Sequence, residues 1–433
     1  MPSTALLRAV EVVDTAAHLG GVVGARLDVP AVLRRRDEWV SRYDDSGQVA
    51  WAEGVGLSVL RGEARLVGAR RVSVATADGE VLLEARRTVV LATGSEPVTL
   101  EPYAACEPWG SRDATAVVEI PDRLVIVGGG VVACEAATWL TALGSRVTML
   151  VREDRLLARV EPFAADLVAD ALRGAGVDLR LHANVESCRR ESPRATGFGR
   201  IHGGVVTLRV DTEDLEADEI LVAAGRRPRL TDLGLDRAGL DQAAVAAGEV
   251  PDWLVVVGDA SGEAALTHWG KYRARVLGAR IAAGATGRDP DPMPANVPVP
   301  QVIFTDPQVA SVGRTEAEAR DAGLDVVVTN VPWSAAAGAG LLRDDATGAA
   351  QLVVDARTHR LVGATFVGTG AGELLHAATI AIVGAVPTEV LRHAVPCYPT
   401  ASELWLRLLE LLPEEFRRPA AAPSDATGPH AEA

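Results

Sequence analysis

The sequence predicts an α/β protein with two Rossmann-like dinucleotide-binding halves and a C-terminal α+β domain. Three observations lead to this class. Residues 124–151 follow the order of a buried strand, a glycine-rich turn, a helix and a second strand. Apolar runs at 87–97 and 254–260 end in small or acidic residues, as ligand-binding strands do. Beyond a proline-rich stretch, 289–300, short strands and helices interleave.

The first observation is the most informative. Residues 124–127 are branched and apolar like a buried parallel strand, 131–143 have a helical pattern, and 147–151 form a second apolar run. Gly128 is expected to make the tight turn, and Gly130 to let the backbone approach a pyrophosphate at the helix N-terminus. The alternative is a glycine-rich turn that only joins a core strand to a core helix.

The part before this unit mixes helices and strands. We expect a helix at the start of the chain and another over 31–43, followed by an antiparallel series of strands at 57–61, 64–66, 71–75 and 81–85. The run 87–97 then ends in A-T-G-S-x-P. Its small residues, including Thr93 and Gly94, let the chain pass tightly beneath a bound dinucleotide. A plain exit from strand to loop is the alternative.

The part after it alternates in the same way. We expect a helix over 162–175 and strands at 177–181, 219–224 and 254–260, with a helix over 266–283. Gly225 follows the second of these strands. Gly258 and Asp259 end the third, which places a carboxylate at the strand edge where open α/β sheets bind ligands.

The C-terminal region has a different pattern. Short strands are expected at 301–304, 310–312, 326–331, 350–355 and 361–367, interleaved with helices over 315–322 and 372–383. This pattern predicts an α+β domain. The last residues, rich in Ala and Pro, predict a disordered tail over 414–433.

Composition limits the possible functions. At 433 residues the chain exceeds one hydrophobic core, so several domains are expected. A net charge of −15 argues against a surface for nucleic acid or anionic membrane, and no 18-residue uncharged apolar run occurs. No signal peptide is evident. The cysteines form no C-x-x-C or C-x-x-x-x-C pair, which favours the cytoplasm and provides no disulfide or metal framework; they are Cys106, Cys134, Cys188 and Cys397.

Several motifs in this order resemble the flavoprotein pyridine nucleotide–disulfide oxidoreductases, such as dihydrolipoamide dehydrogenase, mercuric reductase and mycothione reductase. The segment 2–7, PSTALL, looks like the family's P-S-K-A-L-L, and 128–135 like its NAD(P) signature. Thr93-Gly94 and Gly258-Asp259 match two FAD signatures, and 302–313 matches the start of the dimerisation domain. The resemblance implies an FAD-binding domain in two parts, 1–118 and 232–297, an NAD(P)-binding domain, 119–231, and a dimerisation domain, 298–413.

The resemblance also implies cofactors and partners. FAD would lie against Thr93 and Gly94, with Gly225 and Gly258 nearby and Asp259 bonded to its ribityl chain. Glu135 would sit near the nicotinamide of NADP or NAD. Two chains would pair through the C-terminal domain, and a small molecule would accept the electrons.

The sequence departs from the family in several places. The FAD G-x-G-x-x-G and the redox C-x-x-x-x-C are absent, so we expect an N-terminally truncated chain with an incomplete FAD half. The family's lysine is here Thr4, so Glu135 lacks its usual ion-pair partner. The C-terminal H-P-T-x-S-E is here 398–403, with Tyr398 in place of the acid–base histidine and Glu403 retained.

The histidine replacement affects the chemistry. An imidazole, with a pKa near about 6.5, can shuttle a proton at neutral pH, whereas a phenol, near about 10, is a poor base. Tyr398 could donate a hydrogen bond instead. The alternative is a tyrosine that packs at the dimer interface.

The end of the second strand favours NADP. Val151 stands where NAD-dependent relatives carry Glu, and Arg152 and Arg155 follow. A guanidinium suits a phosphate because its planar fork donates two parallel hydrogen bonds. The alternative is a solvated surface loop of alternating charges.

Three hypotheses remain open from the sequence. The chain is an FAD-dependent NAD(P)H oxidoreductase whose acceptor is not a dithiol, or a flavin-free NADP(H)-binding dimeric remnant without turnover. The third is a misplaced start, with the missing FAD half encoded upstream of Met1.

Overall fold

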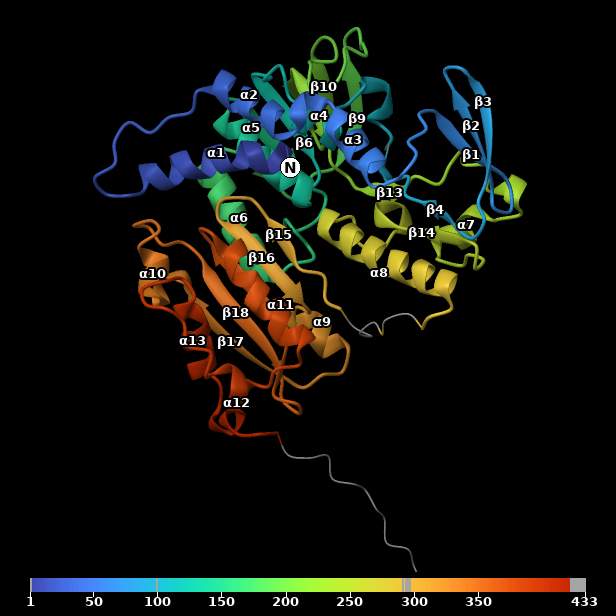
Figure 1. Cartoon of the computed structure of the whole chain (residues 1–433). Coiled ribbons are helices and arrows are strands. Elements are labelled where there is room, and N and C mark those ends of the chain that lie inside the picture. Colours follow the sequence, from blue (N-terminus) through green and yellow to red (C-terminus); the bar gives the residue numbers. More distant parts are fainter. Residues whose placement is uncertain (1, 99, 290–291, 293–296, 421–433) are drawn as a thin grey trace, which may run out of the picture. The chain divides into compact units, whose positions relative to one another are not determined.

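The computed structural model describes residues 2–98, 100–289, 292 and 297–420 and confirms the predicted fold class (Figure 1). Its contacts divide the chain into two compact units. The first unit consists mainly of Leu33–Glu119 and Val185–Ala295, and the second of Ser3–Val32, Ile120–Asn184 and Asn296–Ala433.

The second unit contains the predicted dinucleotide-binding βαβ unit. Strand β6 (Arg123–Val127) leads into helix α5 (Val131–Ala142) and returns as strand β7 (Arg146–Leu150), within a residue or two of the predicted bounds. The two strands pair in parallel, and β7 pairs in parallel with β8 (Asp178–Arg180) after helix α6 (Pro162–Gly174). Apolar residues of α5 and β6 are almost fully buried, so this unit is a packed core.

The same unit contains the C-terminal α+β domain. Five antiparallel strands follow the order β15-β16-β19-β18-β17, with bounds Gln301–Ile303, Gln308–Gly313, Arg360–Gly368, Ala349–Asp355 and Val326–Pro332. Its helices are α9 (Glu316–Asp321), α10 (Ala337–Gly340), α11 (Leu375–Val383), α12 (Thr388–Leu391) and α13 (Glu403–Glu410). Phe366, Trp333 and Leu404 lie in its core.

Helix α1 (Pro2–Ala17) also belongs to the second unit and is longer than the sequence indicated. Its residues Leu6, Leu7 and Val10 are buried because they fall on one side of the helix. The backbone N–H of Asp344 donates to the carbonyl of His18 just beyond the helix. The N-terminal segment is therefore anchored to the C-terminal domain.

The first unit is built from small sheets. Strands β1 (Glu63–Gly68), β2 (Arg71–Thr76) and β3 (Gly79–Glu84) form an antiparallel meander. Strands β9 (Val185–Arg190), β10 (Val206–Val210) and β11 (Glu213–Ala217) form another. Strand β12 (Glu219–Val222) is buried along its length.

Two strand pairs and several short helices complete the first unit. Strand β14 (Leu254–Val256) pairs in parallel with β4 (Val89–Leu91), and β13 (Arg226–Pro228) pairs antiparallel with β5 (Ser95–Pro97). The helices are α3 (Ser46–Gly54), α4 (Ser111–Thr115), α7 (Gln242–Ala246) and α8 (Thr267–Thr286), and α2 (Val29–Trp39) leads into the unit.

Two predictions about this unit were wrong or incomplete. The expected strand at 57–61 is coil, and the exposure of Leu57 and Leu60 shows that no apolar surface covers it. Helix α3, just before it, was missed because its residues show no amphipathic pattern and none of them is buried.

The ordered chain extends further than predicted. The disordered tail was expected from residue 414, but Glu414–Arg417 form a 3-10 helix. Phe416 is buried and stacks on His359 with ring centroids 4.3 Å apart, and Thr388 Oγ1 donates to the Phe416 carbonyl at 2.8 Å. The rest of the predicted tail, 421–433, and 290–291 and 293–296 of the predicted linker lie outside the described residues.

A membrane-spanning element was not expected from the sequence. In the part of the chain that the structure describes, every helix is too short or too polar to cross a bilayer.

Candidate functional site

The turn between β6 and α5 uses each glycine differently. Gly128 has a φ of +119°, a conformation that favours glycine. A Cβ on Gly129 would lie 2.7 Å from Val151 Cγ1, so the turn packs directly against the end of β7. The carbonyl of Gly129 accepts from the Leu157 N–H at 2.8 Å, which fixes the following loop against it.

Gly130 differs because its surroundings are open. It stands at the N-cap of α5 with φ −84°, and a Cβ there would meet no atom within 4 Å. Ala133, one turn into the helix, is fully buried. The geometry therefore leaves free space at the helix N-terminus, where unpaired N–H groups favour an anion.

The two arginines follow the end of β7. Arg152 has an 88% exposed side chain that pairs with Glu153 at 3.1 Å. Arg155 donates from Nη2 to the Ala158 carbonyl at 3.2 Å. An ion pair this exposed is worth little, so Arg152 can exchange its partner at small cost.

Glu135 lies on α5 and is buried. Its Oε1 accepts from the backbone N–H of Phe304 at 2.9 Å. Burial raises the pKa of Glu135, and the hydrogen bond from Phe304 acts in the opposite direction. The hydrogen bond links the nucleotide-binding βαβ unit to the residue that follows β15, the first strand of the C-terminal domain, within the second unit.

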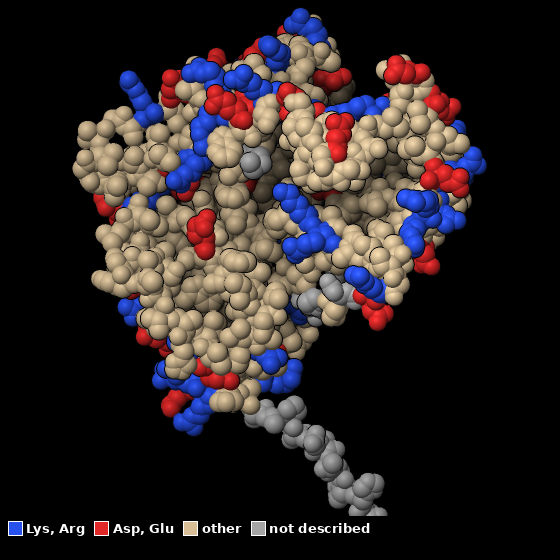
Figure 2. All heavy atoms as spheres, in the orientation of Figure 1, with Lys and Arg blue, Asp and Glu red and all other residues tan. Residues whose placement is uncertain are grey.

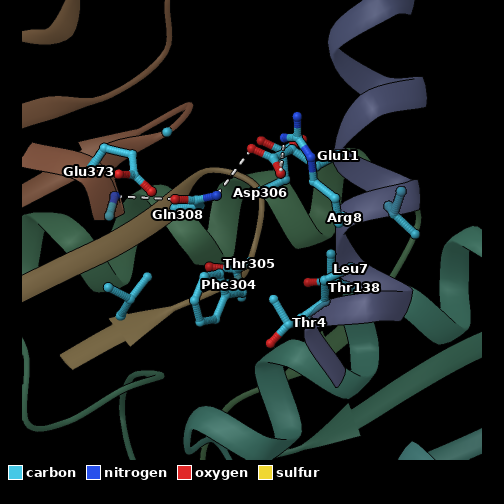
Figure 3. Close-up of a pocket in the computed structure, with 14 residues that line it drawn as sticks. Thr4, Leu7, Arg8, Glu11, Thr138, Phe304, Thr305, Asp306, Gln308 and Glu373 are labelled. Atoms are coloured by element: carbon cyan, nitrogen blue, oxygen red, sulfur yellow. Dashed lines mark hydrogen bonds and ion pairs between the residues drawn. The ribbon is translucent and has the colours of Figure 1, made fainter. Parts of the chain in front are cut away.

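A pocket of about 420 Å³ lies between helix α1 and the segment 302–308, which includes the end of β15 (Figure 3). Thr4, at the position of the family's lysine, lines it together with Thr138 and Phe304. Figure 3 shows Gln308, the first residue of β16, between Glu373 and Glu11 of α1. Its Nε2 donates to Glu11 Oε1 at 3.1 Å, and its Oε1 accepts from the Gly372 N–H at 3.2 Å.

Three carboxylates surround a buried arginine beside the pocket. Arg343 donates to Asp14 Oδ2 at 2.8 Å, to Asp306 at 3.3 Å and to Asp345 at 2.5 Å. Burial raises the pKa of Asp306 to about 7, and the hydrogen bond and charge of Asp14 add to this, whereas Arg343 opposes it. Asp306 is therefore poised to bind a proton near neutral pH.

The first unit places Asp259 in a chain of polar contacts. Asp259 lies in the 3-10 helix Gly258–Ser261, directly after β14, and Gly258 has a φ of +68°. Ser95 Oγ donates to Asp259 Oδ2 at 2.7 Å, and Arg226 Nε donates to Ser95 Oγ at 2.8 Å. Ser95 and Arg226 thus fix the orientation of the Asp259 carboxylate through its Oδ2 atom.

The other predicted residues of this unit lie on neighbouring turns. Thr93 Oγ1 donates to the Arg229 carbonyl at 2.6 Å, and the Arg229 N–H donates to the Gly94 carbonyl at 2.9 Å. Gly94 and Gly225 both have positive φ, +75° and +121°. The structure therefore brings Thr93, Gly94 and Asp259 onto adjoining loops.

Sequence reasoning missed Ser95 and Arg226. Ser95 belongs to the A-T-G-S motif, and Arg226 follows Gly225 directly. The pairing of β13 with β5 brings them together, with Arg227 opposite Glu96. The signal was present, because both residues adjoin predicted site positions, but the pairing that joins them was not predictable.

The predicted residues of the C-terminal domain differ in exposure. Tyr398 is 77% exposed, whereas Glu403 is buried and its Oε2 has no hydrogen-bond partner among the described residues. Ile380 and Val383 of α11 are also exposed. Figure 2 shows few charged side chains over α11, so the exposed face of this helix is largely apolar.

Comparison with protein families gives two matches. The family described as pyridine nucleotide-disulphide oxidoreductase matches residues 1–256. The family described as its dimerisation domain matches residues 299–408. Together these matches cover most of the chain.

Curated relatives have the same organisation. The chain is 33% identical to dihydrolipoyl dehydrogenase 3 of Pseudomonas aeruginosa over 422 residues, which cover 93% of this chain and 86% of the relative. It is 30% identical to a mercuric reductase of Lysinibacillus sphaericus, with 93% of this chain and 73% of the relative covered.

Solved structures have the same fold. The HOCl-induced flavoprotein disulfide reductase RclA from Escherichia coli matches with a TM-score of 0.77 and 23% identity, over 95% of this chain and 89% of that one. LpdA from Mycobacterium tuberculosis matches with a TM-score of 0.79 and 21% identity, over 94% and 89%.

The pKa of Asp306 predicts a pH-dependent stability. Because the folded state raises this pKa from an ordinary value near 4 to about 7, the stabilisation from protonated Asp306 is present below pH 4 and lost as the pH rises to 7. Asn resembles the protonated form. We expect Asp306→Asn to gain roughly 2–4 kcal/mol relative to wild type between pH 4 and pH 8, measured by urea denaturation.

Asp345 provides a control within the same cluster. The Arg343 guanidinium lowers its pKa, so Asp345→Asn should lose stability relative to wild type as the pH rises. If the stability of both variants relative to wild type changed with pH in the same direction, or if that of Asp306→Asn did not change, the raised pKa of Asp306 would be refuted.

Proposed function

Because this chain belongs to the pyridine nucleotide–disulphide oxidoreductase family, we propose that it oxidises NADPH and passes the electrons through FAD to a small-molecule acceptor other than a dithiol. Members of this family are FAD-dependent enzymes that use NAD(P)H. The observation that carries the choice of NADPH is the end of β7, where Val151 stands in place of a carboxylate and Arg152 follows it.

The nicotinamide nucleotide would bind at the β6–α5 turn. Its pyrophosphate would occupy the open space beside Gly130 at the helix N-terminus. Arg152, helped by Arg155, would bind the 2′-phosphate, because a guanidinium donates paired hydrogen bonds to a dianion. Glu153 and Asp154 follow closely, so NAD remains the alternative nucleotide.

The residues of the first unit suit the flavin and ribityl part of FAD but not its pyrophosphate. Asp259, held by Ser95, suits the hydroxyls of a ribityl chain, and Thr93 and Gly94 adjoin it. Within residues 2–98, 100–289 and 297–420, the one glycine-rich turn between a parallel strand and a helix is the β6–α5 turn. The described residues thus supply the flavin end of the site without a cradle for the FAD pyrophosphate, and we infer weak FAD binding.

Bound FAD supplies the redox chemistry, since it takes a hydride from a nicotinamide and returns electrons to an acceptor. The chain itself would orient the nucleotide and hold a buried carboxyl at Glu135. Because desolvation disfavours the charge of Glu135 and Phe304 offers it one hydrogen bond, this group is suited to bind a proton there.

We propose an acceptor other than a dithiol because of Tyr398. It occupies the position of the acid–base histidine, and a phenol is a poor base for a thiol. Tyr398 would instead donate a hydrogen bond to the acceptor, with Glu403 as its buried neighbour in the motif. Reduction of a quinone or dye needs no such base.

The dimerisation domain pairs two chains. We propose that the exposed apolar residues of α11 contribute to this homodimer, because a paired face would remove Ile380 and Val383 from water. We also place the protein in the cytoplasm, on the basis of its cysteine pattern.

A second candidate function is a flavin-free NADP(H)-binding dimer without turnover. Two observations on the first unit favour it. Helix α8 has no buried residue over its 20 positions, and β4 and β14 form a sheet of only two strands among the described residues. The buried residues Leu91 of β4 and Leu254 of β14 belong to a small hydrophobic cluster to which α8, described over its whole length, contributes no residue.

Added FAD separates the two candidates. We expect the purified chain to contain substoichiometric FAD, because the described residues offer no second glycine-rich turn for its pyrophosphate, and to reduce a quinone or dye with NADPH when micromolar FAD is supplied. The measurement is flavin absorbance per chain, followed by NADPH oxidation at increasing FAD concentration.

The outcomes are distinct. Stoichiometric flavin in the purified protein would refute weak binding. Absence of NADPH oxidation at saturating FAD would favour the flavin-free dimer. Reduction of lipoamide as fast as of the quinone would refute the choice of acceptor.

Arg152 tests the choice of nucleotide. Charge-assisted hydrogen bonds contribute about 1.5–3 kcal/mol, so we expect Arg152→Glu to raise the Kd for NADPH roughly 10–100-fold and to change that for NADH far less. Isothermal titration calorimetry with both nucleotides measures this.

Arg173→Glu is the matched control. Arg173 is an exposed arginine on α6 that pairs with Asp170 at 3.4 Å, much as Arg152 pairs with Glu153. Its replacement should leave both Kd values unchanged. Equal affinities of the wild-type protein for NADPH and NADH would refute the proposal that Arg152 binds the 2′-phosphate.

A further inference from the structure

Two cysteines that are distant in the sequence meet inside the first unit. Cys106 lies in the 3-10 helix Ala104–Cys106 and Cys188 lies in β9. Their sulfur atoms are 2.9 Å apart, although 82 positions separate them in the chain. The spacing of the cysteines in the sequence gave no indication of this pair.

The sulfur atoms are already close to bonding distance. A disulfide bond is about 2.05 Å long, so closing it requires the sulfurs to approach by less than about 1 Å. The backbone on both sides is fixed. The Cys106 N–H donates to the Tyr103 carbonyl at 2.9 Å, and Cys188 stands opposite Leu208 in the β9–β10 pair.

A buried arginine accompanies the pair. Arg190, two positions after Cys188 on the same face of β9, donates from Nε to the Cys106 carbonyl at 2.7 Å and from Nη2 to Glu219. Its side chain is 0% exposed. Its Nη1 is buried and has no hydrogen-bond partner among the described residues. A buried cationic donor without a partner is costly unless an acceptor comes to it.

The electrostatics fit a reduced pair at rest. Burial raises the pKa of the Cys188 thiol, and the charge of Arg190 opposes that shift. Both cysteines are almost inaccessible to solvent. A bulky thiol such as glutathione therefore has poor access, and a small oxidant reaches the pair only when the unit opens locally.

We propose that Cys106 and Cys188 form a redox-sensitive dithiol that a small hydroperoxide converts to an intramolecular disulfide. None of its residues belongs to the nucleotide-binding turn or to the residues proposed to hold FAD.

The reaction balances as a two-electron oxidation. The Cys188 sulfur attacks one oxygen of the hydroperoxide, the O–O bond breaks, and a sulfenic acid and an alcohol or water form. The Cys106 sulfur then attacks the sulfenic sulfur, the S–S bond forms, and the hydroxide leaves as water with the remaining thiol proton. Two thiols are oxidised and one hydroperoxide is reduced.

The disulfide would change the stability of the first unit. It would close a long loop, which constrains the unfolded chain. Because the Sγ atoms already lie so close, little strain should offset this gain. We expect a rise of about 5–10 °C in Tm on oxidation.

The experiment uses the full chain with Cys397→Ser, which removes the exposed thiol and leaves three cysteines of four. The protein is treated with hydrogen peroxide, blocked with an alkylating agent in denaturant and digested with trypsin. We expect two of the three thiols to be lost and peptides 88–112 and 181–189 to be linked through Cys106 and Cys188. Cys134 should remain a free thiol, and dithiothreitol should reverse the link.

A second variant tests whether the linked peptide and the rise in Tm depend on Cys188, and the unmutated chain is used if that variant does not fold. Adding Cys188→Ser to Cys397→Ser should abolish both the linked peptide and the rise in Tm. If that variant fails to fold, peptide mapping of the unmutated chain still identifies the bond. Retention of all thiols, oxidation of Cys106 or Cys188 to sulfinic acid without a link, or a link through Cys134 would each overturn the proposal.

Discussion

The contact between Gly129 and Val151 determines the geometry of the nucleotide-binding half. A side chain at position 129 would collide with Val151 at 2.7 Å, so the turn after β6 can lie against the end of β7 only with glycine there. This contact directs Gly130 and the start of α5 toward open space. It also sets the distance from the helix N-terminus to Arg152, the residue that follows Val151. The anion site and the proposed specificity residue thus depend on one packing contact.

A second constraint joins this half to the C-terminal domain within the second unit. Glu135 comes from α5, and its hydrogen-bond donor, the N–H of Phe304, comes from the residue that follows β15. Because a buried carboxyl without a donor is unfavourable, this contact couples the position of the helix to the domain that pairs two chains. The buried Arg343 and its three carboxylates link α1 to the same domain. One residue from each group, Phe304 and Asp306, lines the pocket of Figure 3.

The sequence was sufficient to predict those elements that depend on residues close together in the chain. The strand, turn, helix and strand at 123–150 depend on residues a few positions apart, and their predicted bounds were nearly correct. The error at 57–61 has the opposite cause, because apolar residues suggest a strand only if another surface covers them, and Leu57 and Leu60 are exposed. Contacts between segments distant in the sequence could not be predicted either, because they too depend on which surfaces meet in the folded chain. Neither the relay from Arg226 through Ser95 to Asp259 nor the meeting of Cys106 and Cys188 leaves a pattern in a single sequence.

The central claim is that the open N-terminus of α5 binds the pyrophosphate of a nicotinamide nucleotide. Gly130→Ala tests it most directly, because φ at this position suits any residue and the added methyl group enters empty space, so the fold should be unaffected. Gly174→Ala in α6, where a Cβ also meets nothing, is the control. In calorimetric titration with NADPH, we expect Gly130→Ala to raise the Kd about tenfold or more, equivalent to at least about 1.4 kcal/mol, with Gly174→Ala unchanged. Equal NADPH affinity in Gly130→Ala and wild type, at equal Tm, would contradict the claim.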